Sequence, residues 1–309
     1  MAAYPCSFAP ESTKNISMKV FVTGASGFIG TAVTRELIGA GHKVLGLARS
    51  EESAKHIINE GAEVHHGTLE NTDSLRSGVA KADAVIHLGF NHDFSKFAEN
   101  CEMDRLAIEA LCNELSGSNR PLIVTAGIGP RSSGRPATED TDPIPNPRLP
   151  RISEESALTF LQKGLCVSVV RLPQVHNTAK QGLISGLIAI AKAKGVSAYI
   201  DGGVNRWAAG HVLDVAVLYK LAIEQAVAGR KYHAVGEEGV SLKDIATAIG
   251  GRLKLPVVSI TKEAAADHFG WLAMPASTDM PASSALTQQW LDWHPNHEGL
   301  IADLDNGSY

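Results

Sequence analysis

The sequence has little of what marks several specialised protein classes. Its four cysteines contain no Cys-x-x-Cys pair, so neither a zinc site nor a redox pair is suggested. The net charge of −5 gives no cationic surface for nucleic acid, and no stretch approaches the ~20 apolar residues of a membrane helix. Residues 1–17 lack the basic and apolar segments of a secretory signal. We therefore expect a cytoplasmic protein without a metal ion, a nucleic-acid partner or a membrane partner.

What is present is typical of a globular protein with a sizeable core. The chain has 309 residues, of which 44% are hydrophobic and 20% charged, so it can form one large domain or two modest ones. Only 6% of the residues are aromatic, and none of the five tyrosines has a lysine four positions later. The chain therefore contains no Tyr-x-x-x-Lys sequence.

The most informative segment is a glycine motif near the start of the chain. A run of three β-branched residues and one phenylalanine at residues 20–23 is followed by Gly24, Gly27 and Gly30, and then by an apolar pattern of helical period. In a strand–turn–helix unit, Gly24 permits the tight turn, Gly27 lets the backbone approach a pyrophosphate, and Gly30 lets the helix pack on the strand. The helix N-terminus then directs its free amides at the phosphates. The motif predicts a dinucleotide site.

Strands and helices alternate after this unit, which predicts an α/β fold: a Rossmann-like, doubly wound parallel sheet with a smaller C-terminal substrate lobe. Further strands are expected at residues 43–47, 63–65, 84–88, 121–125 and 166–171, and helices at 104–115, 153–162, 182–194, 214–228 and 241–253. We expect a tail at 1–17, a dinucleotide-binding domain at 18–175, and a lobe at 176–309 that is interleaved with it. The Pro-, Ser- and Asp-rich segment 128–150 is expected to be a long loop, and loops of that length in a compact domain are usually functional or disordered.

The segment from Thr23 to Gly30 resembles the opening of the extended and atypical short-chain dehydrogenase/reductases, a group that includes sugar-nucleotide epimerases and dehydratases. Further matching segments follow in the family's order, namely 67–69, 86–89, 122–125, 170–176, 206–216 and 285–295. The resemblance extends to about Leu304. It implies a bound nicotinamide dinucleotide and oxidoreductase chemistry on a small-molecule substrate; we also allow for a homodimer.

The residues expected to bind the cofactor follow from the motif and the resemblance: Gly24, Ser26, Gly27, Phe28, Ile29, Gly30, Arg49, Ser50, Thr68, Leu69, Leu88, Gly89, Phe90, Leu172 and Pro173. An acid at the end of the second strand would select NAD, but this chain has no acid there before Glu51. Arg49 offers a guanidinium to a 2′-phosphate and Ser50 a hydroxyl, which predicts NADP. The alternative is an exposed arginine that merely starts a surface helix.

The resemblance also implies a Tyr-x-x-x-Lys pair with a nearby Ser or Thr and an Asn, and here the chain departs from the family. Pro150 and Glu154 stand at the tyrosine and lysine positions. Asp104 stands at the asparagine position. Thr125 is the nearest hydroxyl at the serine position, although Gly127 is an equally fair alignment. The familiar general acid is missing.

Four residues are our catalytic candidates: Thr125, His92, Asp104 and Glu154. His92 follows the fourth strand and titrates near neutrality, or it is simply a solvated loop histidine. The two carboxyl groups can act as acids only if burial raises their pKa values, and Asp104 otherwise caps the start of its helix. On the substrate side we single out His176, Trp207 and His211; the alternatives are a structural hydrogen bond for His211 and a place in the lobe's core for Trp207.

The sequence thus predicts an NADP(H)-dependent oxidoreductase that reduces a small hydrophobic carbonyl or imine, reversibly with alcohol oxidation. An epimerase or dehydratase is one alternative, although those reactions begin with an oxidation that the missing tyrosine would promote. A non-catalytic NADP-binding regulatory protein is another, because fold does not imply function.

Overall fold

The computed structural model describes residues 17–129, 135–142, 144 and 150–309. Most of the expected N-terminal tail and part of the expected long loop lie outside these residues. The described chain divides into two compact units. The first holds the described residues of Met1–Ala126, Pro145–Arg171 and Ala216–Tyr232, and the second those of Gly127–Ile144, Leu172–Val215 and His233–Tyr309.

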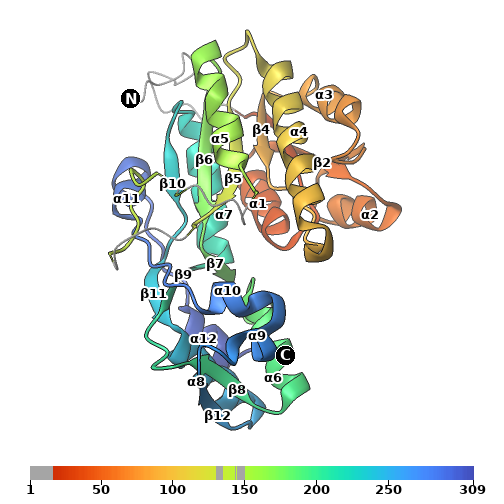
Figure 1. The fold of residues 1–309 in the computed structure, drawn as a ribbon. Coiled ribbons are helices and arrows are strands. Elements are labelled where there is room, and N and C mark those ends of the chain that lie inside the picture. The colour runs from red at the N-terminus through yellow and green to blue at the C-terminus, as the bar shows by residue number, and fades with distance from the viewer. Residues whose placement is uncertain (1–16, 130–134, 143, 145–149) are drawn as a thin grey trace. The chain divides into compact units, whose positions relative to one another are not determined.

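The first unit is built on a seven-stranded sheet in the order β10-β6-β5-β4-β1-β2-β3 (Figure 1). Its strands are β1 (Lys19–Thr23), β2 (Lys43–Ala48), β3 (Glu63–His66), β4 (Ala84–His87), β5 (Leu122–Gly127), β6 (Val167–Leu172) and β10 (Lys231–His233). Strand β1 pairs in parallel with β2 and β4, β2 with β3, and β4 with β5. The expected Rossmann-like parallel sheet is confirmed, and each strand predicted for this sheet is present.

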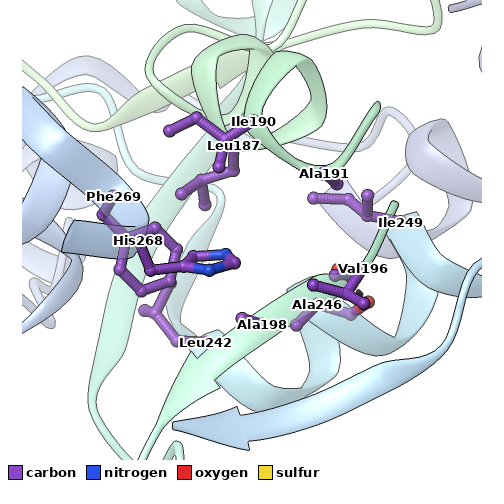
Figure 2. A pocket seen from close by; sticks show the side chains of 11 residues that line it. Leu187, Ile190, Ala191, Val196, Ala198, Leu242, Ala246, Ile249, His268 and Phe269 are labelled. Carbon is purple, nitrogen blue, oxygen red and sulfur yellow. Dashed lines mark hydrogen bonds between the residues drawn. The ribbon is translucent and has the colours of Figure 1, made fainter. Parts of the chain in front are cut away.

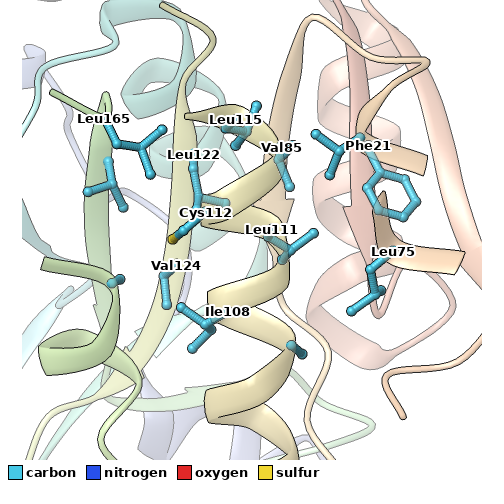
Figure 3. Close-up of a cluster of buried hydrophobic side chains, with 14 of the residues drawn as sticks. Phe21, Leu75, Val85, Ile108, Leu111, Cys112, Leu115, Leu122, Val124 and Leu165 are labelled. Atoms are coloured by element: carbon cyan, nitrogen blue, oxygen red, sulfur yellow. The ribbon is translucent and has the colours of Figure 1, made fainter. Parts of the chain in front are cut away.

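The helices of this unit are α1 (Phe28–Gly39), α2 (Glu51–Asn59), α3 (Thr72–Val79), α4 (Phe97–Leu115), α5 (Ser153–Leu158) and, from Ala216 on, α7 (Val212–Gln225), with 3₁₀ turns η1 (Phe94–Lys96) and η2 (Thr159–Lys163). All four residues of β4 are buried, as expected for a strand covered on both faces. One apolar cluster joins α3, α4 and α5 to the sheet, and Figure 3 shows Ile108 and Leu111 of α4 among the buried side chains of this core.

Helix α4 begins at Phe97, earlier than the sequence pattern predicted. Asp104 therefore lies inside the helix, and the expectation that it caps the start of the helix is wrong. The physical reason is that its side chain is buried and bonds to residues outside the helix, as described below. An aspartate caps a helix only when its carboxylate accepts from that helix's first amides.

The second unit contains two small sheets, in the orders β11-β9-β7 and β12-β8. Its strands are β7 (Gln174–His176), β8 (Ser197–Ile200), β9 (Arg206–His211), β11 (Glu237–Ser241) and β12 (Val257–Ile260). Its helices are α6 (Ile184–Lys194), α8 (Leu242–Leu253), α9 (Ala265–Phe269), α10 (Ala273–Ala276), α11 (Ala285–Leu291) and α12 (Leu300–Asp305), with a 3₁₀ turn η3 (Gly270–Leu272). The predicted start of α8 is confirmed, since Ser241 Oγ accepts from the amide of Asp244 at 3.0 Å.

Two described parts of the expected long loop are held in this unit. Ala137 forms a β-bridge with Ala282, and the buried carboxylate of Glu139 accepts hydrogen bonds from the amide and the hydroxyl of Thr287 at 2.7 and 2.6 Å. None of the helices in the described part of the chain is both long and apolar enough to cross a membrane.

Candidate functional site

The turn between β1 and α1 has the geometry that the glycine motif predicts. Gly24 has φ +72°, a conformation that favours glycine, and its carbonyl accepts from the amide of Gly27 at 2.9 Å. A Cβ on Gly30 would lie 2.0 Å from that carbonyl oxygen, so only glycine lets α1 approach β1 this closely. Within the described residues no side chain caps α1. Its N-terminal amides are therefore suited to bind phosphate.

The loop that follows β4 packs against this turn. A Cβ on Gly24 would lie 2.9 Å from the amide nitrogen of Gly89, and a Cβ on Gly89 would lie 3.1 Å from Leu69. Three segments predicted to hold the cofactor thus meet at the carboxyl end of the sheet, where ligands bind in such folds. Thr68 is half-buried, and its hydroxyl accepts from the amide of Asn71 at 3.3 Å.

Arg49 lies directly after β2 and is exposed. Among the described residues it has no hydrogen-bonding or ion-pair partner, so its guanidinium is available to an anionic ligand. Ser50 is the N-cap of α2, and its hydroxyl accepts from the amide of Ser53 at 3.2 Å. Ser50 is exposed as well, so a ligand can reach the hydroxyl. Leu172 closes β6 and Pro173 follows it, both half-buried in the second unit.

A chain of buried polar side chains runs along the carboxyl end of the sheet in the first unit. His87 at the end of β4 lies between two partners, with Nδ1 2.8 Å from Thr23 Oγ1 and Nε2 3.2 Å from Asp104 Oδ1. Ser153 donates to Asp104 Oδ2 at 2.5 Å. The four side chains are at most 3% exposed. Thr23 Oγ1 also accepts from the amide of Gly89 at 3.0 Å, so the chain of hydrogen bonds continues to the loop after β4.

Asp104 is a carboxylate at neutral pH. Burial acts to raise its pKa, but the hydrogen bond and charge of His87, the charge of Arg151 and the hydrogen bond from Ser153 outweigh burial and hold the pKa below its ordinary value. Asp104 could act as an acid only if its pKa were raised, so it is not suited to donate a proton. The carboxylate is suited to accept a hydrogen bond and to orient Ser153.

Arg151 is a site residue that the sequence patterns did not identify. It directly follows Pro150, which stands at the family's tyrosine position, and its side chain is partly exposed at 26%. Its Nε donates to Ser153 Oγ at 2.9 Å, and its guanidinium lies 4.1 Å over the ring of Phe90. A fixed cation thus lies beside the Ser153 hydroxyl at the sheet's carboxyl end. Its place directly after the family's tyrosine position was the only signal in the sequence.

Two of the catalytic candidates are engaged in internal contacts. Glu154 forms a bidentate ion pair with Arg171 at 2.6 and 2.7 Å, and both side chains are buried. Thr125 Oγ1 lies 2.7 Å from the hydroxyl of Tyr219, whose pKa burial raises above its ordinary value. These contacts favour structural roles for Glu154 and Thr125.

His92, the remaining catalytic candidate, is exposed in the segment after β4. Its ring contacts Phe90 edge-on at 5.3 Å and Phe94 at 6.1 Å between ring centroids. Phe90, which is predicted to bind the cofactor, thus contacts both the imidazole of His92 and the guanidinium of Arg151.

The three residues singled out on the substrate side lie in the second unit. Trp207 is fully buried in that unit's core and donates to the carbonyl of Pro275 at 3.2 Å. His176 is buried, with Nδ1 2.6 Å from Asp303 Oδ2. His211 is half-buried, with Nε2 3.8 Å from the same carboxylate. The structure therefore brings His176 and His211 together and gives Trp207 a place in the core.

A small apolar pocket in the second unit is lined by residues of α6, β8, α8 and α9 (Figure 2). The ring of His268 points into it, and among the described residues Nε2 of this histidine has no hydrogen-bond partner. Burial lowers the pKa of His268, which favours a neutral ring in apolar surroundings. The pocket has room for about one water molecule, so it does not accommodate a substrate.

A family model and two similar proteins match this chain. The model of the NAD dependent epimerase/dehydratase family matches residues 20–148. The Schizosaccharomyces pombe protein C2A9.02 is 46% identical over 94% of this chain and 100% of its own length. The Saccharomyces cerevisiae protein YLL056C is 43% identical over 93% of this chain and 98% of its own length.

More distant relatives have named activities. A Stigmatella aurantiaca enzyme named 4-hydroxy-2-methyl-3-oxo-4-farnesyl-3,4-dihydroquinoline-1-oxide ketoreductase is 25% identical over 86% of this chain and 84% of its own length. Among solved structures, DesIV, a dTDP-glucose 4,6-dehydratase from Streptomyces venezuelae with NAD and TYD bound, superposes with a TM-score of 0.75 at 16% identity. The superposition covers 94% of this chain and 96% of DesIV, and it shows a common fold.

Proposed function

The chain belongs to the NAD-dependent epimerase/dehydratase family, and from this premise we propose that it is an NADP(H)-dependent oxidoreductase. In this proposal it reduces a small hydrophobic aldehyde, ketone or imine and has no Tyr-x-x-x-Lys pair. The observation that carries the proposal is the buried His87–Asp104–Ser153 chain, which ends at Arg151 on the same sheet edge as the glycine turn. A relative that is a ketoreductase supports reduction as the reaction type.

The choice of NADP rests on Arg49. Its exposed guanidinium follows β2, where an acid would bind the adenine ribose of NAD. Arginine can form paired hydrogen bonds with a phosphate, so it is suited to the 2′-phosphate of NADP. The glycine turn and the uncapped start of α1 would hold the pyrophosphate. A bound NADPH supplies the hydride.

The residues of the chain then have distinct roles. Arg151 is suited to stabilise the negative charge that develops on the substrate oxygen as hydride arrives, because its guanidinium is fixed and partly exposed. Asp104 and His87 hold the Ser153 hydroxyl, and with it Arg151, in place. The proton reaches the substrate from His92, which is exposed in the segment after β4, or from water. Orientation of the two reactants supplies much of the rate.

The first experiment follows the near-ultraviolet absorbance of NADPH with panels of hydrophobic aldehydes, ketones and imines. We expect at least one class to consume NADPH. If NADPH binds but no panel consumes it, the non-catalytic regulatory protein is the better assignment. If NADP and sugar nucleotides give product while simple carbonyls do not, the protein is an epimerase or dehydratase.

The second experiment tests the buried chain through Asp104→Asn. The amide keeps the shape but removes the charge that pairs with His87 and Arg151, so we expect turnover to fall by more than tenfold. The Kd for NADPH should stay within a factor of about 2, since Asp104 is not among the predicted cofactor ligands. Glu102→Gln, on the exposed face of the same helix, is the matched control and should leave both unchanged. Wild-type turnover in a folded Asp104→Asn protein would rule this role out.

Assembly as a homodimer and a cytoplasmic location are further parts of the proposal. The molar mass in solution, measured with and without NADPH, tests the first. Fractionation of cells that produce the protein tests the second.

A further inference from the structure

Two histidines and an aspartate, none of which takes part in the reaction proposed above, converge in the second unit. His211 is the last residue of β9, Asp214 lies in the first turn of α7, and His297 lies between α11 and α12. One nitrogen or oxygen from each of the three lies within 4.8 Å of the others. The rings of His211 and His297 stack with centroids 4.8 Å apart and planes only 9° from parallel. Two imidazoles and a carboxylate make a donor set typical of transition-metal sites.

The carboxylate of this cluster is firmly held. Asp214 Oδ1 accepts from the amide of Asn296 at 3.2 Å, and Oδ2 accepts from the amide of His297 at 3.1 Å. The indole of Trp293 donates to the carbonyl of Asp214 at 3.0 Å. The segment that carries His297 is therefore fixed against the start of α7. Ligands held in place before binding lose little conformational freedom when an ion arrives.

The stacked histidines themselves are less completely bonded. His211 Nδ1 accepts a long hydrogen bond of 3.3 Å from the amide of Leu213, and its Nε2 is 3.8 Å from Asp303 Oδ2. His297 Nδ1 lies 2.7 Å from Asp214 Oδ1, and its side chain is 37% exposed. An ion can thus reach the cluster from solvent.

Two further groups lie beside His211. Asp303 Oδ2 is 2.6 Å from His176 Nδ1, and the ring of His176 meets that of His211 edge-on at 5.7 Å. The hydrogen bond to Asp303 orients His176, and the ring of His176 in turn packs against that of His211.

We propose that His211, Asp214 and His297 form a binding site for a divalent transition-metal ion of the zinc type. Imidazole nitrogen favours such ions over Ca²⁺ and Mg²⁺, which prefer oxygen ligands alone. Three protein ligands leave at least one coordination position to water. A bound ion would tie the segment before α12 to the end of β9.

The test is a titration of the full-length protein, first freed of metal with a chelator and dialysed, with Zn²⁺ in a calorimeter. We expect one ion per chain. His297→Ala removes a ligand from an exposed position, so the dissociation constant should rise at least ~10-fold, because even the loss of an outer partner of a ligand costs ~10- to 100-fold. His294→Ala is the matched control, because His294 is exposed nearby and pairs with Asp292 outside the cluster. It should bind as the unchanged protein does.

A second readout does not depend on heat. Co²⁺ bound by imidazole and carboxylate gives visible absorption, which should appear at one equivalent in the unchanged protein and in His294→Ala, and be lost in His297→Ala. Circular dichroism checks that the variants are folded. The proposal is overturned if the unchanged protein shows no saturable binding at one equivalent, or if folded His297→Ala binds as tightly as His294→Ala. Because no step uses NADP or substrate, these outcomes are independent of the proposed enzymatic activity.

Discussion

At the scale of single residues, the candidate site is defined by charges that the family pattern does not have. The resemblance implies a lysine where Glu154 stands, and Arg171 balances this carboxylate in a buried bidentate pair. A buried charge left without its partner is costly, so the two residues depend on each other. Arg151, three residues before Glu154 in the sequence, brings a second arginine to the carboxyl end of the sheet. Arg151 thus supplies a cation near the position where the family's lysine is missing.

Arg49 gives a prediction at this scale. Arg49→Glu replaces the proposed phosphate ligand by a carboxylate that repels phosphate and can accept from a ribose hydroxyl. A charge-assisted contact is worth about 1.5–3 kcal/mol, so the affinity for NADPH should fall ~10- to 100-fold, with NADH binding improved or unchanged. Fluorescence titration with both cofactors measures this. Lys55→Glu, an exposed charge reversal on α2, controls for long-range electrostatics. Unchanged NADPH affinity in Arg49→Glu contradicts the assignment.

At the scale of elements, the contact between β1 and α1 decides how the first unit can bind a dinucleotide. The helix starts against the carbonyl of Gly24, and no side chain in the described residues caps it. The turn therefore packs α1 tightly against β1 and also leaves the N-terminal amides of α1 free to donate to a ligand. A change that adds a methyl group here affects folding and binding together, whereas the same change at the far end of the helix affects neither.

A matched pair of substitutions in α1 tests this. In Gly30→Ala the new Cβ would lie 2.0 Å from Gly24 O, so the helix must move and we expect a loss of about 1–3 kcal/mol in the free energy of unfolding. Gly39→Ala adds the same group at the last residue of the helix, where nothing lies within 4 Å, and should be neutral or stabilising by up to ~1 kcal/mol. Urea unfolding measures both, and NADPH binding should weaken only in Gly30→Ala. Equal stability of the two variants contradicts the packing argument.

At the scale of the whole molecule, the buried network links stability to pH. The folded state holds the pKa of Asp104 below the ordinary value of 3.8. A carboxyl group with a lowered pKa adds stability that is fully present above its unfolded value and is lost as pH falls through its folded value. The unfolded chain takes up this proton first. The first unit should therefore become less stable in acid, beginning below about pH 4.

The prediction is that this acid sensitivity depends on Asp104. The free energy of unfolding of the unchanged protein should fall more steeply below about pH 4 than that of Asp104→Asn, which has no proton to take up at this position. Urea unfolding along a pH series, followed by circular dichroism, measures the two slopes. Glu102→Gln should retain the wild-type slope. Parallel curves for Asp104→Asn and the unchanged protein would mean that other carboxyl groups govern acid unfolding.

The sequence by itself determined the features that depend on neighbours in the chain. Strand and helix periods, the glycine spacing of the β1–α1 turn and the Ser241 cap are local patterns, and the structure contains each of them. The start of α4 was misplaced for the same reason, because Asp104 looks like a cap when only its neighbours in sequence are considered.

Only the tertiary structure decided which polar groups meet. Asp104 is separated by 49 residues from Ser153, and Asp214 by 83 residues from His297, so no spacing rule connects either pair. Whether a carboxylate is a cap, an acid or an anchor is fixed by burial and by its partners, which no local pattern specifies. The fold therefore follows from hydrophobic period and glycine geometry along the chain. The site follows from side chains that packing alone brings within hydrogen-bonding distance.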